Sequence, residues 1–203
     1  MTSAILNNLF QLKLDIEDPE ERFITSGVSW QVYESILNSL GDSSSYRLAY
    51  LSGTLEIMSP SRSHEVDKEN IGRLLEVYLE ENRIPFWGLG SMTIRKEEQK
   101  AGKEPDKCYC IGTDKEIPDL AIEVIYTSGG VDVLEVYQRL GVKEVWFWQN
   151  KQFTIYCLQG DGYEEVSQSQ LLSNLDLVLL SQYVTIGEPL EAIIEWRKKV
   201  RVN

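Results

Sequence analysis

Histidine is almost absent from this chain of 203 residues. The single histidine, His64, excludes zinc sites built on paired imidazoles, acid–base pairs of two histidines and iron sites with two histidine ligands. If the chain binds a metal, we therefore expect carboxylate ligands.

Cysteine and long apolar runs are also scarce. The three cysteines, Cys108, Cys110 and Cys157, are an odd number and form no pair of CxxC motifs, which argues against a disulfide framework or a zinc ribbon. Free cysteines fit a reducing compartment, so we expect a cytoplasmic protein. The chain has no cationic start, and nowhere do about 18 apolar residues follow one another, so we expect neither a signal peptide nor a membrane span.

Positive charge is in deficit. Twenty lysine and arginine residues against 32 aspartate and glutamate residues give a net charge of −12, which disfavours general coating of nucleic acid. The dense basic cluster Arg197–Lys199, with Arg201, could meet a phosphate backbone or simply favour the dipole of a terminal helix. The apolar content of 42% is sufficient for a core, and the length favours one domain over residues 1–203.

Hydrophobic periodicity predicts alternating helices and short strands, and hence a mixed α/β (α+β) domain. We expect a poorly defined arm over residues 1–28 and helices at residues 30–40, after Ser61, at 132–140 and, at the C-terminus, within 186–203. A hairpin with a turn at Ser52–Gly53 is expected over residues 46–58, and a second one across residues 149–151. The strands expected at 84–87, 92–95, 107–111 and 119–125 are interpreted as one sheet.

Three carboxylates surround one of the predicted hairpins. Asp106 lies just before a strand, and Asp119 and Glu123 are four residues apart in the next strand, so the latter two side chains leave the same face. Clustered carboxylates are costly to keep ionised together unless a cation neutralises them. Without histidine, such a cluster suits Mg2+ or Mn2+, which can deliver a hydroxide to a phosphodiester and stabilise the charge that develops on it.

The same carboxylates also have a structural interpretation. Asp106 and Asp119 follow prolines, where aspartate commonly forms turns and caps, and Glu123 could be a paired strand residue. Glu123 slightly favours a metal site over a structural role, because it interrupts an apolar strand and a buried carboxylate needs a partner.

Four segments, taken in order, resemble the Uma-two family of restriction-endonuclease-like nucleases, which have the PD-(D/E)XK fold. They are Gly53–Glu65, Glu104–Ile111, Pro118–Val124 and Ser128–Trp148. The resemblance implies a central mixed sheet flanked by helices, with an N-terminal strand and helix extension. It also implies a Mg2+-dependent (or Mn2+-dependent) active site that hydrolyses DNA phosphodiester bonds, and a homodimer.

The resemblance assigns residues as well. Asp106 matches the aspartate of the family's PD motif and Glu123 the acidic residue of its second motif, and these two would ligate the metal. His64 and Glu65 match the His–Glu entry to the first helix and would complete the site. In our metal-site hypothesis, a backbone carbonyl and waters complete the coordination, and Asp119 is an outer neighbour of the metal ligands.

The lysine of the family motif is missing. Its strand position is Ile125, and the position in the following helix to which the family displaces it is Val133. Valine can neither orient the attacking water nor stabilise phosphate charge. Either Lys68, one turn beyond His64, or Lys107 supplies the cation, or catalysis is weakened or lost.

Three function hypotheses follow. The first is a divalent-metal-dependent endonuclease, and the second is a catalytically inactive nuclease-fold module for binding or assembly. The third, a Cys–His hydrolase that uses a cysteine with His64, has only residue types in its favour.

Other candidates have mainly structural interpretations. His64 itself could merely cap or pack beside the preceding loop, and Glu56 could face the site or water, so it ranks below Glu65. Cys108 and Cys110 are expected to be small core residues, and the aromatic run at 146–148 to be buried sheet rather than a platform for bases.

Overall fold

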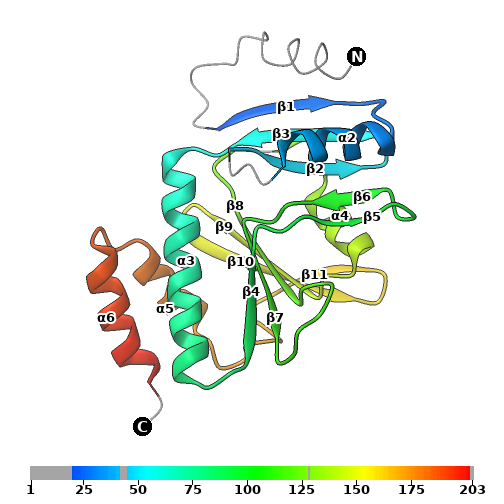
Figure 1. Cartoon of the computed structure of the whole chain (residues 1–203). Helices are drawn as coiled ribbons and strands as arrows, with labels where there is room; N and C mark the ends of the chain where they lie inside the picture. Colours follow the sequence, from blue (N-terminus) through cyan, green and yellow to red (C-terminus); the bar gives the residue numbers. More distant parts are fainter. Residues whose placement is uncertain (1–19, 42–44, 128, 202–203) are drawn as a thin grey trace. The chain divides into compact units, whose positions relative to one another are not determined.

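The structure is a computed structural model that describes residues 20–41, 45–127 and 129–201 (Figure 1). The described residues form two compact units, each assembled from separate stretches of the chain. Of the described residues, unit 1 takes in 20–41, 45–61, 93–104, 127 and 129–140, and unit 2 takes in 62–92, 105–126 and 141–201.

Unit 1 contains a five-stranded antiparallel sheet in the order β1-β3-β2-β6-β5. The strands are β1 (Glu21–Thr25), β2 (Arg47–Leu51), β3 (Thr54–Ser59), β5 (Ile94–Lys96) and β6 (Ala101–Lys103), and the helices are α2 (Trp30–Leu40) and α4 (Val133–Leu140). The predicted hairpin turn is confirmed, since Ser52 and Gly53 both have positive φ and join β2 to β3.

Helix α2 begins and ends where the sequence predicts. The Ser29 side chain accepts a hydrogen bond from the Val32 N–H, and Gly41 ends the helix with a φ of 57°. The helix packs Tyr33 onto the sheet, where its ring stacks on Tyr50 with centroids 4.8 Å apart. Gly102 makes this packing possible, because a Cβ there would lie 2.3 Å from the Tyr33 hydroxyl oxygen.

Unit 2 contains a six-stranded mixed sheet in the order β11-β10-β9-β8-β7-β4. The strands are β4 (Phe86–Gly90), β7 (Lys107–Ile111), β8 (Leu120–Val124), β9 (Glu144–Gln149), β10 (Gln152–Gln159) and β11 (Gly162–Val166), and the helices are α3 (Arg62–Glu81), α5 (Leu177–Val184) and α6 (Pro189–Val200). Strands β8 and β9 are parallel, and the other pairs are antiparallel. The carboxyl ends of β8 and β9 therefore lie at the same edge.

One face of the unit 2 sheet is covered by α3 and α5, and α6 packs against these two helices. A single apolar core joins α3, α5 and α6 to alternate residues of the central strands, including Ile122 and Trp146. Helix α6 is tied to α3 by the Trp196 indole, which is buried and donates to the Leu74 carbonyl oxygen at 2.7 Å. Trp146 and Trp148 are both buried, as expected for a core role.

The mixed α+β class and the mixed sheet flanked by helices are confirmed, but three local expectations differ. Ile94–Lys96 belongs to the unit 1 sheet, so the interpretation of the strands between residues 84 and 125 as one sheet is wrong. Glu21–Thr25 pairs with β3 instead of remaining an undefined arm, while residues 1–19 of that expected arm lie outside the described residues. Strands β6 and β11 and helix α5 are absent from the predicted elements. Strand β6 is only three residues long, and β11 follows an exposed turn.

Within the described part of the chain, no helix is long and apolar enough to cross a bilayer.

Candidate active site

Asp106 and Glu123 lie at one end of the β7–β8 hairpin of unit 2. In this antiparallel pair Lys107 is opposite Ile122 and Cys108 is opposite Ala121, so extending the register by one residue puts Asp106 opposite Glu123. Both residues are buried, with exposed fractions of 2% and 7%. The register of the hairpin thus puts these two acidic residues opposite each other.

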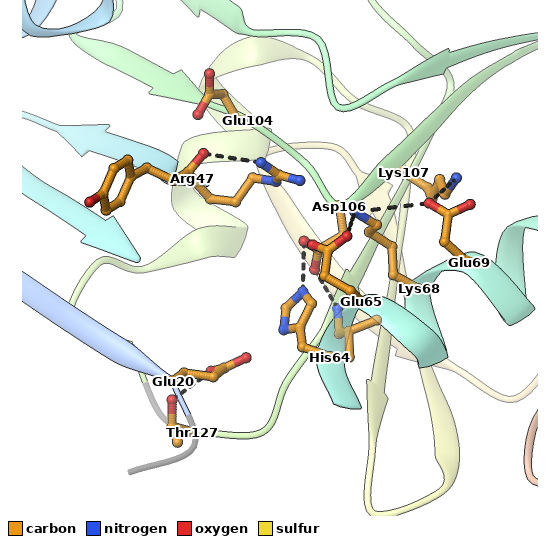
Figure 2. Close-up of polar contacts among 12 residues, drawn as sticks. Glu20, Arg47, His64, Glu65, Lys68, Glu69, Glu104, Asp106, Lys107 and Thr127 are labelled. Carbon is orange, nitrogen blue, oxygen red and sulfur yellow. Dashed lines mark hydrogen bonds and ion pairs between the residues drawn. The ribbon is translucent and has the colours of Figure 1, made fainter. Parts of the chain in front are cut away.

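The carboxylate of Asp106 is held by two protein groups. Its Oδ2 accepts a hydrogen bond from the Val124 N–H at 2.8 Å. Its Oδ1 lies 2.9 Å from Nε2 of His64, which is fully buried in the first turn of α3 (Figure 2). The strand and the helix therefore fix the orientation of this carboxylate between them.

Glu65 and Lys68 lie beside this pair on the same end of α3. Lys68 is four residues beyond His64, so the two side chains share one helical stripe. The Lys68 ammonium is buried and contacts the Glu65 carboxylate (Figure 2). A buried ammonium is costly without a negative partner, and Glu65 supplies one.

Lys107 reaches α3 from the start of β7. Its Nζ lies 2.9 Å from Glu69 Oε1, and the same oxygen lies 3.9 Å from Lys68 Nζ (Figure 2). Gly72 leaves room for the lysine, because a Cβ there would come within 3.0 Å of Lys107 Cε. The structure thus brings both lysines named from the sequence to one surface of α3. The other candidate position, Val133, begins α4 and belongs to unit 1.

Asp119 is part of a different network at the other end of β8. Its Oδ2 accepts from the Ile111 N–H at 2.9 Å and contacts Lys115, while Oδ1 lies 2.9 Å from Lys143 Nζ. Burial alone would raise the pKa of Asp119, but these donors outweigh it and hold the pKa below its usual value. The structural interpretation of this carboxylate is therefore the better one.

We expect Asp119→Asn to destabilise the fold by about 1–3 kcal/mol at pH 7, because two lysines lose their anionic partner. The folded-state pKa is lowered, so the contribution of Asp119 is present above the unfolded-state pKa of about 3.9 and is lost as pH falls through the folded value. Urea unfolding at pH 7 and near pH 3 should therefore show a difference between wild type and variant that shrinks on acidification. A difference that grows on acidification would contradict this assignment.

The cysteines are poor nucleophiles. Burial, together with nearby Cys110 and Glu123, raises the pKa of the Cys108 thiol to about 12. Burial likewise raises the pKa of Cys110, and burial with Glu144 raises that of Cys157 to about 11. A Cys–His hydrolase needs a lowered thiol pKa, so the structure disfavours this hypothesis.

Two further sequence candidates have structural partners. The buried Glu56 carboxylate of unit 1 accepts from the N–H groups of Gly130 and Val131, at 2.8 and 3.1 Å, and pairs with Arg22. In the basic cluster, Arg197 pairs with Glu81 at 2.5 Å and Lys198 with Glu195 at 2.6 Å, which offsets part of its charge.

Sequence reasoning missed Tyr126 and Asp67. The Tyr126 ring lies beside that of His64, with centroids 6.4 Å apart, and its hydroxyl donates to Asp67 Oδ2 at 2.9 Å. An aromatic residue two positions beyond the end of the acidic strand is the available signal for Tyr126. Asp67 gave none, because its partners are 59 and 81 residues away in sequence.

The donor set at the end of the hairpin suits a hard cation. Mg2+ commonly binds one or two protein carboxylates and retains several waters, so Asp106 and Glu123 fit its requirements. Among the residues that the structure describes, no three His, Cys, Asp or Glu side chains form a group able to hold a metal. Water or backbone oxygens would therefore have to complete the coordination.

A family model whose description is "Uma2: Putative restriction endonuclease" matches residues 30–186, a span that contains His64, Asp106 and Glu123. The chain belongs to the Uma2 family. The resemblance to this family (Uma-two) is thereby confirmed, and the mixed sheet flanked by helices is consistent with a restriction-endonuclease-like fold. Uma2 membership supports a nuclease, and hence a nucleic-acid substrate, and families of this kind generally use divalent metals. No curated protein matches the chain.

Proposed function

We propose that this Uma2 protein is a divalent-metal-dependent endonuclease that hydrolyses DNA phosphodiester bonds. The observation that carries the proposal is the buried Asp106 carboxylate, fixed by His64 and placed opposite Glu123 by the hairpin register. A homodimer, a cytoplasmic location and Mg2+ or Mn2+ as the metal belong to the same proposal. They rest on the family resemblance and, for the location, on the free cysteines.

Asp106 and Glu123 would hold the metal, with a backbone carbonyl and waters. When bound, the metal would supply a hydroxide for attack and stabilise the charge that builds on the phosphate. The Val124 N–H orients one oxygen of Asp106, and His64 fixes the carboxylate from the side of α3. These contacts limit the motion of a ligand group before substrate arrives.

Lys68 is the better substitute for the missing lysine. It is buried on the same helical stripe as His64, whereas Lys107 pairs with Glu69, whose side chain is largely exposed. Glu65 holds the Lys68 ammonium in place. A positioned ammonium can orient the attacking water and attract phosphate oxygens, which is the work of the lysine in the family motif.

The alternative is a catalytically inactive nuclease-fold module for binding or assembly. The apolar residue at position 133 and the net charge of −12 favour it. The two functions differ in whether the chain binds Mg2+ or Mn2+ and nicks DNA.

His64 offers a direct test of the metal site, because it is the only histidine in the chain. Its ring protons are therefore an unambiguous NMR probe of Asp106. We expect Mg2+ to shift these resonances, since metal binding changes the partner of Asp106 Oδ1, and we expect supercoiled plasmid to be nicked with Mg2+ or Mn2+ but not with EDTA.

Two variants make this test specific. Glu123→Gln should weaken the Mg2+-dependent shift by about tenfold or more, because one of two anionic ligands is lost. Asp114→Asn is the matched control, an exposed carboxyl between the same two strands, and it should respond like wild type. Unchanged His64 resonances at about 20 mM Mg2+ and Mn2+, without nicking, would refute the proposal and favour the inactive module.

A further inference from the structure

A cavity of about 440 Å³ adjoins the candidate active site within unit 2. Its walls come from α3, from the segments that follow β8 and end β9, and from the segment between α5 and α6. The volume falls within the range of about 300–1,000 Å³ that is usual for small-molecule sites. Ligands of open α/β sheets commonly bind beyond the carboxyl ends of parallel strands, which is where this cavity lies.

Tyr126 joins the cavity to the active site. It lines the cavity, and its ring lies 6.4 Å from that of His64, the partner of Asp106. The residue is 41% exposed, yet its hydroxyl is anchored to Asp67. An anchored and accessible aromatic ring is a suitable platform for stacking a nucleobase, because every base has a π face.

Asp67 supplies a directed acceptor in the same cavity. The Tyr126 hydroxyl and the buried Trp148 indole N–H both donate to Oδ2, each at 2.9 Å. No donor in the described ranges contacts Oδ1 of this carboxylate. A carboxylate oxygen fixed in this way favours a ligand with an N–H donor, and carboxylates pair with the exocyclic amino group of cytosine.

We propose that this cavity receives an unpaired nucleobase that carries an exocyclic amino group (cytosine, adenine or guanine) from the nucleic-acid substrate. Tyr126 stacks on the base, Asp67 Oδ1 accepts from its amino group, and Lys151 on the cavity wall attracts the adjoining phosphate. The inference rests on the proposed function, because the nuclease role is what makes nucleic acid the ligand. It adds a preference among bases that the metal site alone does not impose.

Calorimetric titration of the full chain with dCMP, dAMP and dTMP, in EDTA, tests the cavity separately from cleavage. We expect dCMP and dAMP to bind at least about fivefold more tightly than dTMP. Asp67→Asn should reverse this preference, because Tyr126 and Trp148 keep the amide oxygen at the Oδ2 position. The amide NH2 then takes the place of Oδ1 and favours the carbonyl oxygens of thymine.

Variants of exposed aromatic residues test the stacking. Tyr126→Ala should weaken dCMP binding about tenfold, and Tyr126→Phe should retain most of it, because only the hydroxyl is lost. Trp87→Ala is the matched control, since Trp87 is 40% exposed in the same unit but does not line the cavity, and binding should be unchanged. Circular dichroism checks each fold, and Tyr126→Leu replaces the alanine variant if that one does not fold.

Equal affinity for the three nucleotides, no binding at about 20 mM, or an equal loss in Tyr126→Ala and Trp87→Ala would each overturn the inference. DNA nicking without nucleotide binding refutes the cavity proposal and leaves the endonuclease intact. Base-selective binding without nicking supports the cavity and removes the endonuclease. The failures of the two proposals are therefore distinguishable.

Discussion

Replacing Asp106 with asparagine should reduce metal-dependent plasmid nicking by about 1,000-fold or more. The variant removes one of the two anionic ligands proposed for the metal. For comparison, loss of a single hydrogen-bond donor that stabilises charge in a transition state commonly lowers the rate about 100- to 1,000-fold. A metal ligand also sets whether the ion is present at all. We therefore expect an effect at or beyond the upper end of this range.

Asparagine separates this effect from a loss of fold. Its side-chain oxygen can still accept from the Val124 N–H, so that buried donor retains a partner, whereas alanine would leave it without one. We expect Asp106→Asn to unfold at a urea concentration near that of wild type and to show no Mg2+-dependent shift of the His64 resonances. Nicking by Asp106→Asn at the wild-type rate would exclude the proposed site.

Replacing Lys68 with alanine should reduce nicking by about 100-fold while metal binding persists. The ammonium of Lys68 is proposed to act on water and phosphate rather than on the metal, so its loss should lower the rate without removing the Mg2+ response of His64. Lys107→Ala is the matched control, because it removes a second lysine that shares Glu69 with Lys68. We expect it to lower nicking by less than about threefold.

Two further variants sharpen the assignment. Lys68→Met keeps the length of the buried chain without its charge, so a rate as low as that of Lys68→Ala would identify the charge as the cause. Val133→Lys tests the helix position that the family resemblance implies for the lysine, and partial recovery of the rate in a Lys68→Ala background would support that resemblance. If Lys107→Ala proves the more damaging change, the roles of the two lysines must be exchanged.

Local signals predict most of the elements of this fold. Ser29 and Gly41 mark both ends of α2, and the β9–β10 turn contains Asn150 and Lys151, both with positive φ. Such signals act within a few residues, so they can be found in a sequence. The partner of a short strand is set by pairing over long distances instead, and for that reason local signals place the strand expected at 92–95 in the wrong sheet.

The candidate site, like the fold, can be predicted from the sequence only in part. The sequence indicates only that Asp106, just before one strand, could converge on Glu123 in the next, and the register of the structure puts the two residues opposite each other. Alternation alone does not predict the contact of His64 with Asp106, and the family resemblance implies only that His64 and Glu65 complete the site. The contacts of Asp67 with Tyr126 and Trp148 join three separate elements through polar groups, and no sequence period encodes such contacts.

The Trp196 indole that donates to the Leu74 carbonyl has a consequence for where this protein can be shortened. The Uma2 match stops at residue 186, before α6 begins at Pro189. A chain cut there would remove the additional donor that Trp196 gives to the Leu74 carbonyl oxygen and would uncover the apolar side of the helix that carries His64. The limit of family similarity is thus not a safe place to end the protein, and the last helix has to be kept whenever His64 and its neighbours are studied.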